Sequence, residues 1–268
     1  MLKIKDGTIR RGSYELQGVN IDVPKNTITV LVGRNASGKS TLIDGIIGSL
    51  LFQNGTIEKE QLNIAYVGTD NPFDKRVEGM LMSSVMKEVD STFDPQKFRY
   101  YLDEFLIPVY MNVSEMSTGQ LKLFTLALGL ARDTNLLILD EIDTNLDVVH
   151  KNKLEKIFAD YMTVEGRSII VSTNQLELYD DVADRVIYIK DKAVFYAGEV
   201  SELIANYTVW IGNEEEFSQL SPDDIVYYEK NQFNIKALLH KPSPKNDLKI
   251  SEILLGLERS RHETIHKR

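Results

Sequence analysis

Apolar residues alternate with polar ones along part of this chain and form short continuous runs along others, and both patterns predict strands. Residues 13–23 alternate, which predicts a half-buried strand that ends at a proline-containing turn. Residues 27–32 form a β-branched run that is typical of a strand buried on both faces of a sheet. Further strands are predicted over residues 64–67, 136–139 and 168–172, and a hairpin about residues 190–192.

Helical patterns separate these strands, over residues 41–51, 77–110, 118–131, 148–162 and 250–257. Strands that alternate with helices indicate an α/β fold. The composition changes after residue 207, where three consecutive glutamates at 214–216 and the prolines at 242 and 244 stand out. We therefore expect an α/β core over residues 1–75 and 130–205, a helical insertion over 76–129 and a small C-terminal extension over 206–268.

Composition limits the classes of function. The chain has 268 residues, 43% of them hydrophobic, which is enough to bury a full core. Its formal net charge of −9 argues for no nucleic acid partner, because no overall positive field would hold a polyanionic backbone. The absence of cysteine agrees with a cytoplasmic protein. The first residues do not resemble a secretory signal, and no apolar run reaches the roughly 18 residues of a membrane span, so we expect membrane work to require another chain.

The segment GRNASGKST, residues 33–41, joins a predicted buried strand to a predicted helix. It matches G-x-x-x-x-G-K-[ST] in the strand and helix context of a phosphate-binding loop. The glycines let backbone amides wrap phosphate oxygens, Lys39 adds a positive charge and the Ser40 hydroxyl can ligate Mg²⁺. We therefore expect nucleotide contacts from Gly33, Arg34, Asn35, Ala36, Ser37, Gly38, Lys39, Ser40 and Thr41.

The segment LLILDE, residues 136–141, supplies two carboxylates. Its apolar residues predict a buried strand whose C-terminal end delivers Asp140 and Glu141 to the crevice where α/β sheets bind ligands. Asp140 would hold Mg²⁺, and Glu141 would act as the catalytic base that polarises the attacking water. Acidic residues after a strand also serve as helix caps, but the phosphate-binding loop favours the catalytic interpretation.

The segment STGQ, residues 117–120, stands directly before an apolar helix. Ser117 and Gln120 have the spacing of a capping box, in which each side chain satisfies a backbone amide of the first turn. A serine, a glycine and bare amides at a helix N-terminus also form an anion site. This segment by itself leaves both interpretations open.

Taken in order, the phosphate-binding loop, STGQ before a helix and LILDE resemble the ATP-binding-cassette (ABC) family over roughly residues 2–205. The resemblance implies a P-loop NTPase (ABC ATPase) core with an antiparallel β subdomain, within a domain over residues 1–205. MSTGQ stands where the family has LSGGQ, which implies that Ser117, Thr118, Gly119 and Gln120 complete the nucleotide site of a second subunit. Residues 144–147 match the loop that couples the two sites of a dimer and add a nucleotide contact from Asp147. ATP and Mg²⁺ are the implied cofactors.

Three positions depart from the family's pattern. Thr69 stands at a metal-contacting glutamine position, and Asn174 stands at a histidine position. Asn174 can donate a hydrogen bond to a γ-phosphate oxygen but cannot titrate, and with Glu177 it also forms a capping pattern. The family's base-stacking aromatic aligns with Arg10 or Arg11, and Tyr14 is the aromatic candidate a few residues later. We expect slow but real hydrolysis, because Glu141 is retained.

The implied function is ATP binding and hydrolysis that power a separate transmembrane permease subunit from the cytoplasmic, inner face of the cell membrane. ATP would close a homodimer, or a heterodimer with a paralogous ATPase. Residues 76–81 and 250–254 are similar to segments of ATPases that serve ABC-2-type exporters, which favours export. A non-transport ABC ATPase and a low-turnover regulatory module gated by ATP stay open as alternatives.

Overall fold

The computed structural model describes residues 1–68, 73, 77–144, 146, 148–242 and 248–260. The chain forms two compact units. The first comprises Met1–Asn174 and Arg185–Ala197, and the second comprises Gln175–Asp184 and Gly198–Arg268. The expected domains over residues 1–205 and 206–268 remain a prediction. None of the helices in the described ranges has the length and apolar character needed to cross a membrane.

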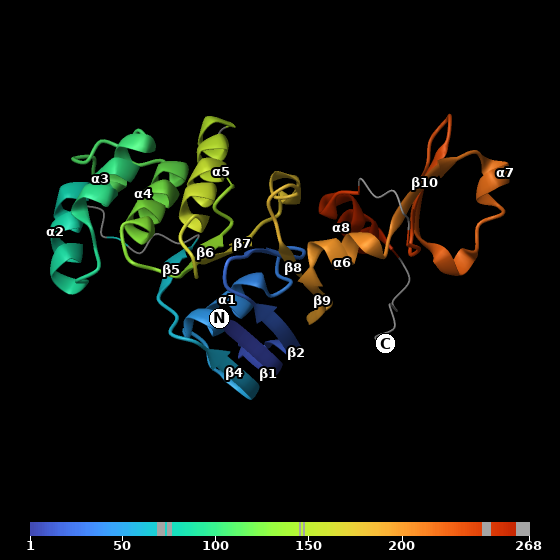
Figure 1. The fold of residues 1–268 in the computed structure, drawn as a ribbon, viewed down its shortest axis with the longest axis horizontal. Helices are drawn as coiled ribbons and strands as arrows, with labels where there is room; N and C mark the ends of the chain where they lie inside the picture. The colour runs from blue at the N-terminus through green and yellow to red at the C-terminus, as the bar shows by residue number, and fades with distance from the viewer. Residues whose placement is uncertain (69–72, 74–76, 145, 147, 243–247, 261–268) are drawn as a thin grey trace. The chain divides into compact units, whose positions relative to one another are not determined.

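The first unit is built on a nine-stranded sheet (Figure 1). Its strands follow in the order β4 (Phe52–Lys59), β1 (Leu2–Arg11), β2 (Tyr14–Val23), β9 (Ala193–Glu199), β8 (Arg185–Lys190), β3 (Ile28–Val32), β7 (Ser168–Ser172), β6 (Leu136–Asp140) and β5 (Ile64–Val67). Strands β4, β1 and β2 pair antiparallel, whereas β8, β3, β7, β6 and β5 pair parallel. The predicted α/β core with an antiparallel β subdomain is therefore confirmed.

The register of the parallel strands brings the ends of three strands together. Ser172 at the end of β7 is paired with Asp140 on β6 and with Leu31 on β3. All residues of β3, β6 and β7 are buried, as expected for strands covered on both faces. The loop that follows β3 and the carboxylate that ends β6 therefore emerge at the same edge of the sheet.

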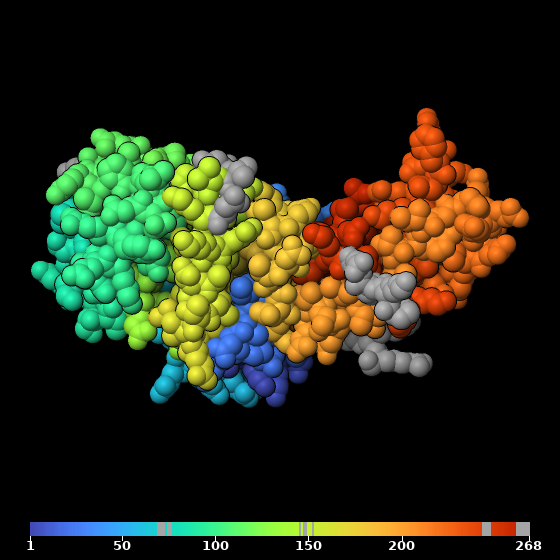
Figure 2. Space-filling model, turned by 45° about the horizontal axis from the view of Figure 1, so that its top comes forward, coloured from blue at the N-terminus to red at the C-terminus, as the bar shows by residue number. Residues whose placement is uncertain are grey.

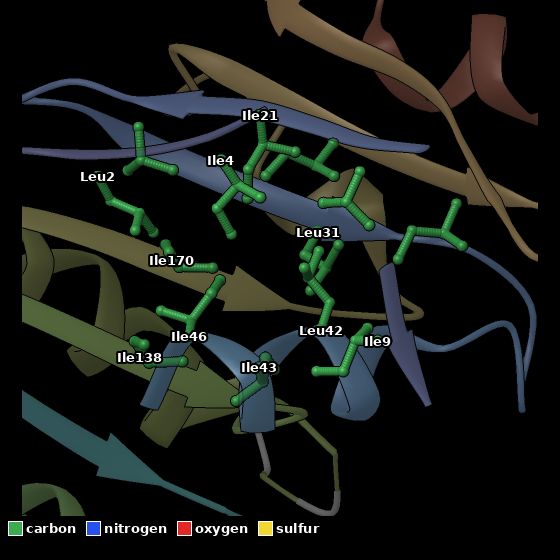
Figure 3. Close-up of a cluster of buried hydrophobic side chains, with 14 of the residues drawn as sticks. Leu2, Ile4, Ile9, Ile21, Leu31, Leu42, Ile43, Ile46, Ile138 and Ile170 are labelled. Carbon is green, nitrogen blue, oxygen red and sulfur yellow. The ribbon is translucent and has the colours of Figure 1, made fainter. Parts of the chain in front are cut away.

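Helix α1 (Lys39–Ile47) packs between the antiparallel and parallel parts of this sheet (Figure 3). Its residues Leu42, Ile43 and Ile46 are fully buried. They belong to one apolar cluster with Leu2, Ile4, Ile9 and Ile21 of the antiparallel strands and Leu31, Ile138 and Ile170 of the parallel strands. Burial of each such side chain contributes about 1.5–3 kcal/mol, so this cluster fixes the start of α1, and with it the loop before α1.

The helical insertion consists of α2 (Gly79–Val89), α3 (Pro95–Glu104) and α4 (Thr118–Leu130), which Figure 2 shows in green beside α5 (Val148–Met162) in yellow. The helical stretch predicted over residues 77–110 is thus two helices. Asp94 explains the break, because its Oδ1 accepts from the amides of Gln96 at 2.8 Å and Lys97 at 3.2 Å and so starts a new helix at Pro95.

The second unit contains a three-stranded antiparallel sheet in the order β10 (Thr208–Gly212), β12 (Ile235–Leu239) and β11 (Ile225–Lys230). Its helices are α6 (Val200–Ala205), α7 (Glu214–Phe217) and α8 (Ile250–Arg259). Short 3-10 turns lie at Val113–Glu115 in the first unit and at Leu176–Leu178 and Pro222–Asp224 in the second. The last helix includes the predicted range 250–257, and Ile250, Ile253 and Leu257 of α8 are buried.

Candidate functional site

The loop between β3 and α1 has a backbone that glycine makes possible. Gly33 and Gly38 have φ values of 153° and 109°. A Cβ at Gly33 would lie 2.4 Å from the carbonyl oxygen of Ile189, and one at Gly38 would lie 2.2 Å from the hydroxyl oxygen of Tyr14. The loop ends at the N-terminus of α1, where free backbone amides and the helix dipole favour an anion.

Lys39 places a positive charge inside this loop. Its side chain is 5% exposed. Its Nζ donates to the carbonyl oxygens of Gly33 at 2.7 Å and Arg34 at 3.4 Å, and to Oδ1 of Asn174 at 3.1 Å. Burial lowers the pKa of Lys39, and the nearby carboxylates of Glu141 and Asp140 oppose that shift. The ammonium group is therefore held by neutral oxygens, and it can leave them to contact an anion.

Ser40 and Asp140 form a pair of oxygen donors next to Lys39. The Ser40 hydroxyl donates to Oδ2 of Asp140 at 3.1 Å, and the Ser172 hydroxyl donates to the other carboxylate oxygen. Mg²⁺ is commonly held by one or two protein oxygens, with water and phosphate oxygens completing an octahedron. This pair fits that ion, and no larger cluster of three or more His, Asp or Glu side chains with a metal-binding arrangement occurs in the described ranges.

Asn174 connects Lys39 to Glu141. Its Nδ2 donates to Oε1 of Glu141 at 2.8 Å, while its Oδ1 accepts from Lys39. The helix-capping interpretation of Asn174 is not supported, because the short turn Leu176–Leu178 has Gln175 at its N-cap and no side-chain cap. The amide thus bridges the cation and the carboxylate that the sequence singled out separately.

A cavity of about 430 Å³ opens in front of these groups. It is lined by Arg11, Tyr14, Asn35, Ala36, Gly38, Lys39, Ser40, Thr41 and Glu141. The Tyr14 hydroxyl donates to the carbonyl oxygen of Ser37, and burial raises the pKa of that hydroxyl. Tyr14 and Arg11 therefore both border the cavity, which a residue in contact with the nucleotide base must do.

Ser117 caps α4 as the spacing predicts. Its hydroxyl oxygen accepts from the amide of Gln120 at 3.2 Å, and its own amide donates to Oε1 of Gln120 at 3.0 Å. Ser117 and Thr118 are exposed. None of residues 117–120 is among the described residues that line the cavity. The capping box does not prevent the N-terminus of α4 from also contacting another chain.

Two predicted site residues, Thr69 and Asp147, lie outside the described residues. The sequence pattern did not single out Lys122 and Ser172, which contact Glu141 and Asp140, or the neighbouring pair Asp143 and Thr173, which contact each other. Lys122 carried a signal, since it interrupts an otherwise apolar stretch of helix. Ser172 ends the buried strand at 168–172 and is paired with Asp140, and Thr173 follows it directly.

Known proteins resemble this chain in sequence and in fold. Residues 16–144 match the family described as ABC transporter. The chain is 27% identical over 206 residues to the ABC transporter ATP-binding protein YtrB of Bacillus subtilis, which covers 73% of this chain and 70% of that protein. It is 26% identical over 212 residues to the petrobactin import ATP-binding protein FpuD of Bacillus anthracis, with 69% and 76% covered. An ATP-binding subunit of an ABC transporter of known structure superposes with a TM-score of 0.73 at 16% identity, over 97% of this chain and all of that one.

Proposed function

We propose that this chain, which belongs to the ATP-binding subunits of the ABC transporter family, binds Mg-ATP in the cavity at residues 33–41 and hydrolyses it. The observation that carries the proposal is two neighbouring sets of hydrogen bonds. Lys39, Asn174 and Glu141 are joined by hydrogen bonds, and Ser40 and Asp140 are joined beside them. The residues that we propose as phosphate cradle, metal-binding pair and base therefore lie at the ends of adjacent strands, which supports the proposal.

Each residue has a role that follows from its chemistry. The amides of the loop and the Lys39 ammonium bind phosphate oxygens, and Ser40 and Asp140 hold Mg²⁺. When bound, Mg²⁺ neutralises charge on the phosphate oxygens. Glu141 polarises the water that attacks the γ-phosphate, and Asn174 positions the Glu141 carboxylate through its amide. Asn174 brings no titrating group, which is why we propose slow turnover.

We further propose that ATP closes a dimer in which Ser117 to Gln120 of one subunit contact the nucleotide of the other, together with Asp147 and a metal contact from Thr69. The support is the exposed, capped N-terminus of α4, which lies away from the cavity of its own chain. Helix N-termini are ready-made anion sites. Two identical chains suffice for this arrangement, and a paralogous ATPase can replace one of them.

ATP-binding subunits of this family work with separate membrane components. We propose that a transmembrane permease subunit docks on the helical insertion, at the inner face of the membrane. The support is a row of exposed apolar side chains on α2, formed by Leu81, Val85 and Val89 at helical spacing. Export is the direction we propose from the similarity of residues 76–81 and 250–254. A relative named for import matches the same core, so the core does not decide the direction.

The experiment compares wild type with Glu141→Gln for steady-state ATP hydrolysis and for size in Mg-ATP. We expect the wild type to turn over slowly and Glu141→Gln to bind ATP, lose hydrolysis and accumulate as a dimer. Lys39→Met is the control that should lose both binding and dimerisation. Unchanged nucleotide affinity in Lys39→Met would contradict the site. ATP binding by wild type with neither hydrolysis nor dimerisation would favour the ATP-gated regulatory module, and co-purification with a permease separates a transporter from a non-transport ATPase.

A further inference from the structure

Lys122 is a buried cation in the apolar interior of α4. Its side chain is 6% exposed, and it lies five residues after the cap Ser117. Its Nζ donates to the carbonyl oxygen of Glu141 at 2.5 Å and to that of Thr144 at 3.2 Å. Burying an ammonium group is costly unless hydrogen bonds and opposite charge compensate, so a lysine at this place requires a physical reason.

Asp143 is a buried carboxylate, 1% exposed, in the chain between Glu141 and Thr144, whose carbonyl oxygens accept from Lys122. Its Oδ2 accepts from the Thr173 hydroxyl, whereas its Oδ1 has no hydrogen-bond partner among the described residues. Burial raises the pKa of Asp143, and Lys122 is one of the groups that lower it again. In the same way burial lowers the pKa of Lys122, and among the carboxylates that oppose this shift Asp143 has the largest effect. Each charge therefore opposes the effect of burial on the pKa of the other.

Glu141 has a backbone that needs such support. Its φ is 51°, in the left-handed region that a residue with a side chain adopts only at a cost of roughly 1–3 kcal/mol. Its amide donates to the carbonyl oxygen of Ser172 at 3.0 Å, and its carbonyl accepts from Lys122 and from the amide of Thr144 at 3.2 Å. Lys122 thus holds one side of the Glu141 residue, and β7 holds the other.

We propose that Lys122 is a positioning residue for ATP hydrolysis, which fixes the backbone of Glu141 from α4, and that Asp143 is its counter-charge. The inference rests on the proposed function of Glu141 as the base. It also gives α4 a physical link to the chain's own base, because the helix whose N-terminus carries Ser117 also carries Lys122. The competing explanation is that Lys122 and Asp143 form a buried pair that serves stability alone.

The test uses the full chain with Lys122→Met, Asp143→Asn and the double variant, so that both charges can be removed together. We expect Lys122→Met to lower both the melting temperature and kcat, with kcat reduced by about 10- to 100-fold and KM for ATP changed by less than about twofold. The double variant should recover most of the melting temperature, since no buried charge is left alone and the amide oxygen introduced by Asp143→Asn can still accept from Thr173. It should not recover kcat. Lys153→Met is the matched control, because Lys153 also donates to a backbone carbonyl, that of Glu104.

Hydrogen exchange provides a readout that does not depend on turnover. We expect amides of residues 140–144 to exchange at least about tenfold faster in Lys122→Met and in the double variant, and at the wild-type rate in Lys153→Met. Recovery of kcat together with melting temperature in the double variant would overturn the proposal, and so would wild-type exchange at residues 140–144. If the wild type does not hydrolyse ATP, the proposed function fails, while the exchange rates still decide whether Lys122 fixes this segment.

Discussion

Among the single residues of the site, Asn174 places a neutral amide between a cation and a carboxylate. It accepts from Lys39 and donates to Glu141, so it orients both without changing charge. An imidazole at this position would also be able to donate and accept, but its charge would change near pH 6.5. Substitutions at this position can therefore test separately what the hydrogen bonds contribute and what a titrating side chain contributes.

We predict that Asn174→His raises kcat by about tenfold or more, because a positioned acid–base group is typically worth 10²- to 10⁴-fold. The ratio of the variant's rate to the wild-type rate should change between about pH 5.5 and 8, where only the variant titrates at this position. Rates of hydrolysis across that range are the measurement. Asn174→Ala, which removes both hydrogen bonds, should lower kcat. A ratio that stays constant over the whole range would show that a titrating group at this position does not contribute to the reaction.

Between helices, Asp90 joins the end of α2 to the end of α4. Its Oδ1 accepts from the amide and the hydroxyl of Thr92 at 2.9 and 2.7 Å, and its Oδ2 accepts from Nε of Arg132 at 2.5 Å. These hydrogen bonds, led by the Thr92 hydroxyl, lower the pKa of Asp90 to about 2. The folded state therefore favours the ionised carboxylate, and the stabilisation is fully present above the ordinary pKa near 4 and is lost as the pH falls toward 2.

We predict that Asp90→Asn lowers the free energy of unfolding by about 1 kcal/mol at pH 7, the usual contribution of a charge-assisted hydrogen bond that is partly exposed. The difference from wild type should be the same at about pH 5 and become smaller below about pH 4. Urea unfolding at several pH values measures it. Asp133→Asn is the control, because Asp133 is 82% exposed and its ion pair with Arg167 is long, at 3.7 Å. A loss of similar size in both variants would show that Asp90 acts only as a surface charge.

The elements with strong local patterns were predictable from the sequence, and the others were not. β3, β6 and β7 are apolar runs, and α8 has one apolar face. β4 was missed because nearly all of its side chains are exposed, so its residues show no apolar alternation. β4 pairs with β1 through the backbone, and Ile4 lies opposite Ile57 in their register. Such pairing leaves little trace in the residues of a single strand.

The candidate site likewise has a part that was predictable from the sequence and a part that was not. Residues 33–41 and 136–141 were predictable, because each motif is continuous in sequence and its chemistry is local. The contacts that join them were not, since they bring together residues far apart in the chain: Lys39 with Asn174, and Lys122 with Glu141. Sequence spacing can suggest that Lys122 is unusual in an apolar helix, but only the packing of α4 against the end of β6 shows what it holds.

At the scale of the whole molecule, the proposed dimer would give the N-terminus of α4 a second role besides its helix cap. Ser117 makes a complete capping box within its own chain, so a stabilising role alone would explain its presence. If ATP joins two copies, the same hydroxyl and amides face the nucleotide of the partner. Aspartate separates these roles, because it caps helices as well as serine does but adds a negative charge.

We predict that Ser117→Asp leaves the melting temperature of the nucleotide-free chain within about 2 °C of wild type and abolishes the Mg-ATP dimer of the Glu141→Gln background. The carboxylate would face phosphate, and like charges in an interface cost several kcal/mol. Ser117→Ala should do the reverse, with a loss of about 1 kcal/mol in stability from the missing cap and a dimer that is weakened but still formed. Thermal unfolding without nucleotide and size in Mg-ATP measure the two effects separately. A Ser117→Asp variant that dimerises like its parent would leave Ser117 with the cap as its only role and would move the partner's contact to another part of the chain.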